Sequence, residues 1–248
     1  MQANEKLKVT DLLVRRWISY CIGLFLVALA ISCSVKSGLG ISPSSSMAYV
    51  AGLANGWSMG TWTAIFYTSF VALQIILKGR AFELKNLLQV PVSMAFGVVV
   101  ELTNFLFSFT PDPTNYAAQL GYLGLSLIIM GFGYVYYLPP NIIALPSEGV
   151  MQGVSPRFGL KNSTAKLIRD PLCVIATFAI SLTCLGGIVG IREGTIVAAF
   201  GNGLALKDLH EAVQRKAVRS TFGREEHKRS ASSSRSTGVV RPDFSLRE

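Results

Sequence analysis

The chain has 248 residues, of which half are hydrophobic and only 15% are charged, and its mean hydropathy is +0.45. These values exceed those of a soluble domain of this size and indicate an integral membrane protein. The net charge is +9, but the basic residues flank apolar runs instead of forming one face with interleaved aromatic side chains, which argues against a nucleic-acid partner.

Five apolar runs are long enough to cross a bilayer core about 30 Å thick as helices. They predict transmembrane helices at Ile18–Val35, Met59–Leu77, Asn86–Thr110, Ala117–Leu138 and Pro171–Ile191. A sixth run, Gly194–Leu206, is only about 20 Å long as a helix. We include it as a sixth span because a strongly basic segment follows it.

Lys and Arg residues alternate with these apolar runs. They precede the first run and are concentrated in the gaps after the second and the fourth, whereas the other gaps hold almost none. Loops rich in Lys and Arg remain in the cytoplasm. We therefore expect an all-α integral membrane protein with about six transmembrane helices and with both termini in the cytoplasm.

Two segments, Ser37–Ser58 and Asn141–Asn162, are too long for tight turns and too broken for full spans. In each, a Pro followed by a Ser opens a short helix-like run that closes on a Gly. Such residues at membrane depth are typical of re-entrant or discontinuous helices, whose free backbone groups face protein or a cavity.

The two broken segments align at an offset of 103 residues, which pairs Pro43 with Pro146, Ser44 with Ser147 and Gly56 with Gly159. Each half of the chain then has the same order of elements: a span, a broken segment and two more spans. Three spans per half is an odd number, so the halves, at about 15–110 and 117–210, are expected to have inverted orientations. Inverted repeats with paired broken helices are typical of secondary transporters.

The segment 213–248 has a different composition, with nine basic and four acidic residues and a Ser-rich stretch. Such a segment buries too little apolar surface to order itself, so we expect a membrane domain at 1–212 followed by a disordered cytoplasmic tail. Either the tail contacts anionic lipid headgroups, at roughly 1 kcal/mol per basic residue near the surface, or it is simply solvated.

Glu101 lies within the third predicted span, where an ionised carboxylate is costly unless it is paired, hydrated or protonated. It is a candidate for ion coupling or for binding a basic substrate. Alternatively, Glu101 has only a structural role, either protonated or hydrogen-bonded to a broken helix. Asn104 lies on the same helical face and would share its hydrogen bonds.

The starts of the two broken helices hold the other candidates for binding or coupling. Ser42, Ser44 and Ser45 offer hydroxyl groups beside free backbone amides, where anions bind readily. In the second half, Ser147 and Glu148 follow Pro146, and they either cap the short helix or bind a polar ligand in a cavity.

Asp170 follows Arg169 directly and is expected to pair with a basic neighbour. The chain has no nucleotide-binding loop, paired-His metal helix or nucleophile elbow. We therefore predict no enzyme activity, cofactor or metal site, although a membrane enzyme with Glu101 and Glu148 as its acids stays open.

The motif Gly38-Leu39-Gly40-Ile41-Ser42-Pro43, with Gly56 and Gly60-Thr61 after it, resembles the opening of the YitT/YczE-type family of bacterial multi-pass inner-membrane proteins. The resemblance covers roughly residues 15–205. Family members often have an acid two residues after this proline, where this chain has Ser45, whereas Glu148 keeps the acid after Pro146. The resemblance implies a bacterial inner membrane as the location and transport as the function.

We interpret the chain as a small secondary transporter or exporter of an unknown small polar solute, which would bind between the two broken helices. A single copy forms only a thin wall around a pathway, so a homodimer in the lipid bilayer is expected. The alternative is a membrane accessory or regulatory protein that acts through helix-face contacts and its tail. A substrate-capture subunit of an ATP-driven partner also fits the size.

Overall fold

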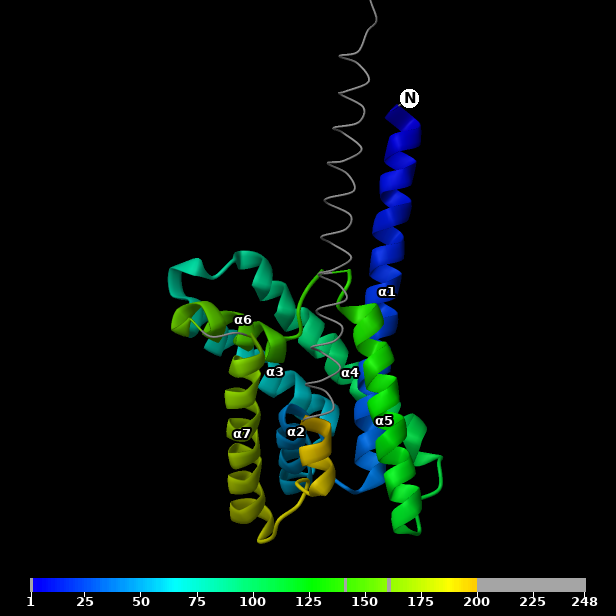
Figure 1. The fold of residues 1–248 in the computed structure, drawn as a ribbon, viewed down its shortest axis with the longest axis vertical. Coiled ribbons are helices and arrows are strands. Elements are labelled where there is room, and N and C mark those ends of the chain that lie inside the picture. The colour runs from blue at the N-terminus through cyan, green and yellow to red at the C-terminus, as the bar shows by residue number, and fades with distance from the viewer. Residues whose placement is uncertain (1, 141, 160–161, 200–248) are drawn as a thin grey trace, which may run out of the picture. The chain divides into compact units, whose positions relative to one another are not determined.

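The computed structural model describes residues 2–140, 142–159 and 162–199, all within the first of two units, 1–207 and 208–248. The described residues form helices and no strands (Figure 1). The main helices are α1 (Gln2–Ser37), α2 (Pro43–Asn55), α3 (Met59–Lys78), α4 (Gln89–Ser108), α5 (Tyr116–Tyr137), α6 (Pro146–Phe158) and α7 (Asn162–Ile180).

Among the described residues, five segments are long and apolar enough to cross a membrane: Leu13–Ser37, Met59–Ala81, Leu84–Ser108, Tyr116–Tyr137 and Ile168–Leu185. They match the five longer predicted spans, with shifted ends. Residues 193–199, at the start of the sixth predicted span, are helical, and the rest of that span and the tail lie outside the described residues. The exposed side chains on these helices are largely apolar, as a lipid-facing surface requires.

The fifth predicted span was placed wrongly at its start. Pro171 does not begin a helix but lies inside α7, which starts nine residues earlier at Asn162. Arg169, counted as a loop residue, therefore belongs to a helix, and its side chain is only 14% exposed. A charged pair looks like the end of a span in sequence, whereas here the two charges are buried together.

The predicted broken segments form the short helices α2 and α6, each of 13 residues. At 1.5 Å per residue these helices are about 20 Å long and cannot cross a bilayer core. Pro43 and Pro146 open them, where the fixed φ and the missing amide of proline suit a helix start. Gly56 ends α2 with φ +69°, and Gly159 follows α6 with φ +63°. Both glycines thus have the left-handed backbone conformation that is common just after the last turn of a helix.

Helices α1 and α5 form a close antiparallel pair. Ser19 Oγ donates to Tyr136 O near one end and Cys33 Sγ donates to Tyr122 O near the other. The pair approaches closely because Gly133 lies against Val27, where an added Cβ would come within 2.9 Å of a Val27 methyl. Helix α4 packs on α1, and α3 packs on α4.

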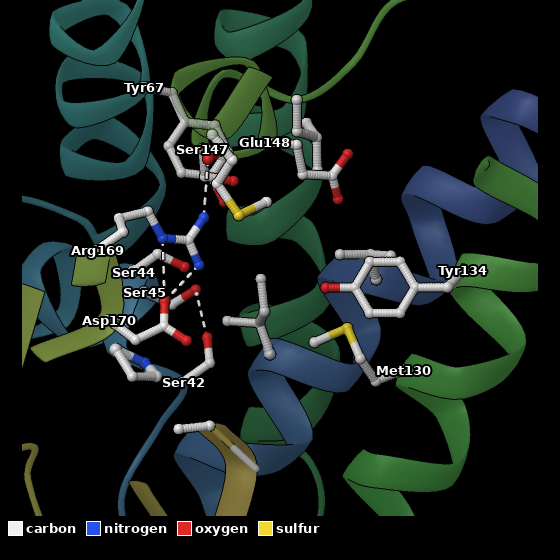
Figure 2. A pocket seen from close by; sticks show the side chains of 16 residues that line it. Ser42, Ser44, Ser45, Tyr67, Met130, Tyr134, Ser147, Glu148, Arg169 and Asp170 are labelled. Carbon is white, nitrogen blue, oxygen red and sulfur yellow. Dashed lines mark hydrogen bonds and ion pairs between the residues drawn. The ribbon is translucent and has the colours of Figure 1, made fainter. Parts of the chain in front are cut away.

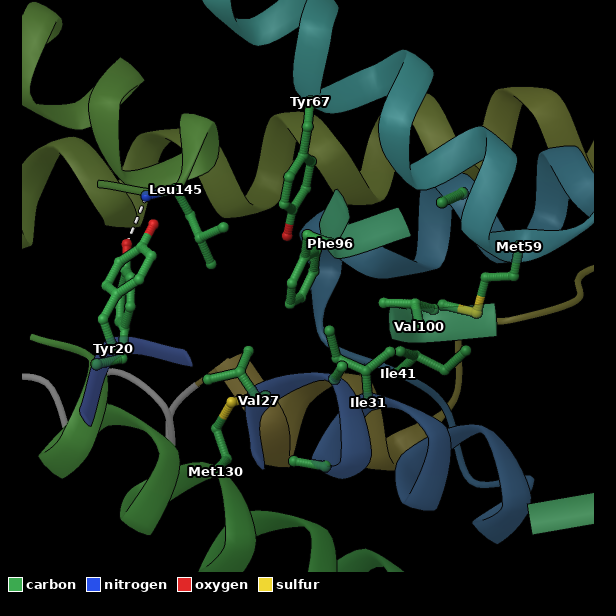
Figure 3. Packing of buried hydrophobic residues seen from close by; sticks show 14 residues of the cluster. Tyr20, Val27, Ile31, Ile41, Met59, Tyr67, Phe96, Val100, Met130 and Leu145 are labelled. Atoms are coloured by element: carbon green, nitrogen blue, oxygen red, sulfur yellow. Dashed lines mark hydrogen bonds between the residues drawn. The ribbon is translucent and has the colours of Figure 1, made fainter. Parts of the chain in front are cut away.

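The short helices pack across the molecule. Helix α2 contacts α3 and α7, and α6 contacts the same two helices. A buried cluster that includes Val27, Ile31, Phe96 and Met130 lies beside them and joins α1, α4 and α5 (Figure 3). The Tyr67 ring of α3 stacks on Phe96 at a centroid distance of 5.7 Å. The starts of α2 and α6 are therefore surrounded by spans.

Candidate functional site

A cavity of about 40 Å³ lies between the N-termini of α2 and α6 (Figure 2). Residues from these two helices and from α1, α3, α5 and α7 line it. One water needs roughly 10–15 Å³ of such space. The cavity therefore has room for about three waters or for one small polar group.

The two helix starts have the same hydrogen bonding. The carbonyl of Ser42 accepts from the amides of Ser45 and Ser46, both at 2.9 Å, and the carbonyl of Leu145 accepts from those of Glu148 and Gly149, also at 2.9 Å. The aligned peptide dipoles of a helix also place a partial positive charge at its N-terminus. Two such positive ends thus meet at the cavity.

Arg169 and Asp170 form a buried ion pair at the cavity wall. The Asp170 carboxylate accepts from Arg169 Nε at 3.0 Å and from Nη2 at 2.5 Å, and Arg169 Nη1 donates to Ser147 O at 2.8 Å. Both side chains are at most 14% exposed. The local pairing expected for Asp170 is confirmed. Through its hydrogen bond to Ser147 O, Arg169 also links α7 to the first turn of α6.

Glu148 is held in the first turn of α6 by an aromatic side chain of α5. Tyr137 Oη donates to Glu148 Oε2 at 2.8 Å and accepts from the Leu145 amide. The Tyr20 ring lies 5.7 Å from the Tyr137 ring, and Tyr20 Oη donates to Ile143 O. Helix α6 is therefore capped by Tyr137, and the carboxylate of Glu148 lies near the positive end of its own helix.

Most cavity residues form pairs that are 103 positions apart, the offset at which the two broken segments were aligned. These pairs are Val27 and Met130, Ile31 and Tyr134, Ser42 and Leu145, Ser44 and Ser147, Ser45 and Glu148, and Tyr67 and Asp170. The first half contributes hydroxyl groups, whereas Glu148, Arg169 and Asp170 all come from the second half. Residues 103 positions apart thus line the same cavity but, in most pairs, have different side-chain chemistry.

Five of the seven predicted site residues line this cavity: Ser42, Ser44, Ser45, Ser147 and Glu148. The other two do not. Glu101 is exposed and its Oε2 accepts from the Gly60 amide at 3.2 Å, at the N-terminus of α3. Asn104 Nδ2 lies 3.6 Å from Met59 Sδ at the same helix start. These two residues therefore belong to the α3–α4 contact.

Sequence reasoning missed Arg169, Tyr67, Tyr134 and Tyr137. The sequence alignment at an offset of 103 held a signal for Arg169, because it places this residue opposite Phe66, inside a span. Figure 2 shows the Tyr134 hydroxyl pointing toward the middle of the cavity, across from Arg169. Among the described residues no three His, Cys, Asp or Glu side chains are grouped as metal ligands.

The chain belongs to a family of unknown function, DUF6198, which matches residues 14–210. It is 25% identical over 204 residues to the uncharacterized membrane protein YczE of Bacillus subtilis (strain 168), over 82% of this chain and 89% of YczE. It is 23% identical over 203 residues to the uncharacterized protein YyaS of the same strain, over 81% of this chain and 94% of YyaS. No solved structure matches the chain. With its five apolar helices, it is a membrane protein, and the resemblance to YczE-type proteins is confirmed.

Proposed function

We propose that the protein is a secondary transporter or exporter of a small polar solute in the bacterial inner membrane, and that the cavity between α2 and α6 is its binding site. The observation that carries the proposal is the meeting of the two short-helix N-termini at a small cavity lined by polar and apolar side chains. Transporters bind solutes near the middle of the membrane at such discontinuous helices.

The proposal includes two inverted halves, each with a short helix and three spans. The cross-packing of the short helices supports it, because α2 contacts α7 and α6 contacts α3. The positions 103 apart that line the cavity support it further. Movement of one half against the other would open the cavity to either side in turn.

The cavity chemistry suits a small solute with hydrogen-bonding groups. Ser and Tyr hydroxyl groups can act as donors, and the carboxylates of Glu148 and Asp170 can act as acceptors. Sites for drug-sized ligands measure about 300–1,000 Å³, far more than the cavity offers. In the described conformation the cavity therefore has no room for a drug-sized ligand, and a larger solute would enter only when the helices separate.

The test is a thermal-stability screen of the purified protein in detergent against pools of metabolites and inorganic ions. A ligand that binds only the folded state increases the free energy of unfolding, by about 2.7 kcal/mol when its concentration is 100 times its Kd. The melting temperature rises as a result. We expect a pool to stabilise the wild type and the Glu101→Gln variant, and the effect to be lost in Glu148→Gln, because only Glu148 lines the cavity.

Two results would contradict the proposal. One is a ligand that stabilises all three proteins equally, which would place its site elsewhere. The other is the absence of any stabilising pool together with a normal cellular phenotype of Glu148→Gln. The accessory-protein alternative would then be pursued through its binding partners.

A further inference from the structure

The carbonyl of the first proline in each short helix accepts a hydrogen bond from a buried side chain: from Ser46 of α2 itself in one case and from Gln74 of α3 in the other. In the first half Ser46 Oγ donates to Pro43 O at 2.9 Å and lies 3.0 Å from Thr177 Oγ1 of α7. In the second half Gln74 Nε2 of α3 donates to Pro146 O at 3.2 Å and to Gln89 Oε1 of α4 at 2.8 Å. Pro43 and Pro146 are the equivalent first residues of α2 and α6.

The residues that make these contacts also correspond by position. Thr177 lies 103 positions after Gln74, and Gly149 lies 103 positions after Ser46. We define the α2 tether as Ser46 with Thr177, and the α6 tether as Gly149 with Gln74. All the side chains in the two tethers are fully buried.

The two tethers differ in which helix supplies the larger share of the side-chain volume. In the α2 tether, the short helix supplies a hydroxyl group and the span supplies the small Thr177. In the α6 tether, the short helix supplies no side chain, and the longer Gln74 reaches over Gly149 to the proline carbonyl. A Cβ added to Gly149 would lie 2.6 Å from Gln74 Cδ and 2.7 Å from Nε2. The amide of Gln74 thus occupies the place that a serine at 149 would need.

We propose that the α2 and α6 tethers are equivalent positioning contacts of the two halves and that their residues can be exchanged as pairs. Each tether fixes the first turn of a short helix, and so sets where the positive helix end meets the cavity. The inference rests on the two-half architecture of the proposed function. It concerns folding stability, so its test does not need a solute.

The test compares how Gly149→Ser changes the melting temperature in two backgrounds, because we expect the change to have opposite signs in them. A serine in place of Gly149 overpacks the wild type, and we expect the melting temperature to fall by roughly 2–12 °C. In a Gln74→Thr background the same substitution rebuilds a Ser–Thr contact, and we expect it to raise the melting temperature. A serine at Gly153, where an added Cβ makes only ordinary contacts with Lys78, is the matched control and should rescue nothing.

The reciprocal exchange keeps the test decisive if Gly149→Ser does not fold. The Ser46→Gly and Thr177→Gln pair would build the α6 type of tether in the first half, and it should melt above either single variant. The proposal is overturned if Gly149→Ser lowers the melting temperature equally in both backgrounds. It is also overturned if neither double variant melts above its single variants. If the double variants regain stability but no solute pool stabilises the wild-type protein, the result would count against the transport proposal alone.

Discussion

The buried ion pair Arg169–Asp170 gives the sharpest stability prediction. The substitution Asp170→Asn keeps the shape of the side chain and removes its charge. Arg169 would then keep its hydrogen bond to the Ser147 carbonyl but lose its counter-charge in a place where its side chain is only 14% exposed. A buried charge without its counter-charge is strongly destabilising, so we expect a large loss of stability.

The magnitude follows from the burial of both partners. Breaking a buried pair by removing one charge costs about 3–5 kcal/mol. For a chain of this size, 1 kcal/mol corresponds to about 2–4 °C in melting temperature, so the expected loss is roughly 6–20 °C. Removing both charges, in Arg169→Gln with Asp170→Asn, leaves no lone charge and should recover part of this loss.

The assay is thermal unfolding of the purified variants in detergent. The chain provides a matched control in Arg192 and Glu193, which are also adjacent and also paired, at 3.3 Å, but about half exposed. Glu193→Gln should cost no more than about 1 kcal/mol. The reasoning would be refuted if Asp170→Asn melted like Glu193→Gln, or if the double variant were less stable than Asp170→Asn.

Two further stability predictions concern contacts of α5 and α4. Tyr137→Phe removes the donor to Glu148 and should cost about 1–3 kcal/mol, whereas the exposed Tyr136→Phe should be neutral; equal melting temperatures would contradict the capping role. Gly97→Ala places a Cβ 2.5 Å from a backbone carbonyl oxygen of α3 and should cost roughly 1–3 kcal/mol. At Gly121, which has open space, the same change should not destabilise, and equal losses at both positions would count against close helix packing.

Local sequence signals were sufficient for the five longer spans and for five of the residues that line the cavity. Runs of apolar residues located five helices, because helix length and bilayer thickness set a simple requirement. Pro43 and Pro146, each followed by a serine, located the starts of the short helices, because proline suits only the first turn. The alignment at an offset of 103 pairs Ser44 with Ser147, and both of these residues line the cavity together with Glu148.

The remaining features depend on tertiary contacts that no local pattern records. Arg169 resembles a loop residue because a hydropathy window treats a charge as the end of a span, whereas here Asp170 and the Ser147 carbonyl allow its burial. Glu101 resembles a coupling residue because it lies within an apolar run. Its position opposite the first turn of α3 depends on how α3 and α4 cross at Gly60 and Gly97.

The central claim is that the cavity between α2 and α6 opens to water, and the equivalent residues Ser44 and Ser147 test it most directly. Each would be replaced by cysteine in a chain whose four native cysteines have been changed to serine, and a small cationic thiol reagent would be applied to proteoliposomes. A cysteine at the buried Ser93 of α4, which does not line the cavity, is the unreactive control, and one at the exposed Thr61 is the reactive control.

We predict that both cavity cysteines react, more slowly than the one at Thr61, because the reagent enters only when the helices separate. Labelling of the folded protein that stays at the level of the Ser93 control for both positions would contradict the account. The cavity would then be a closed packing defect and not a binding site.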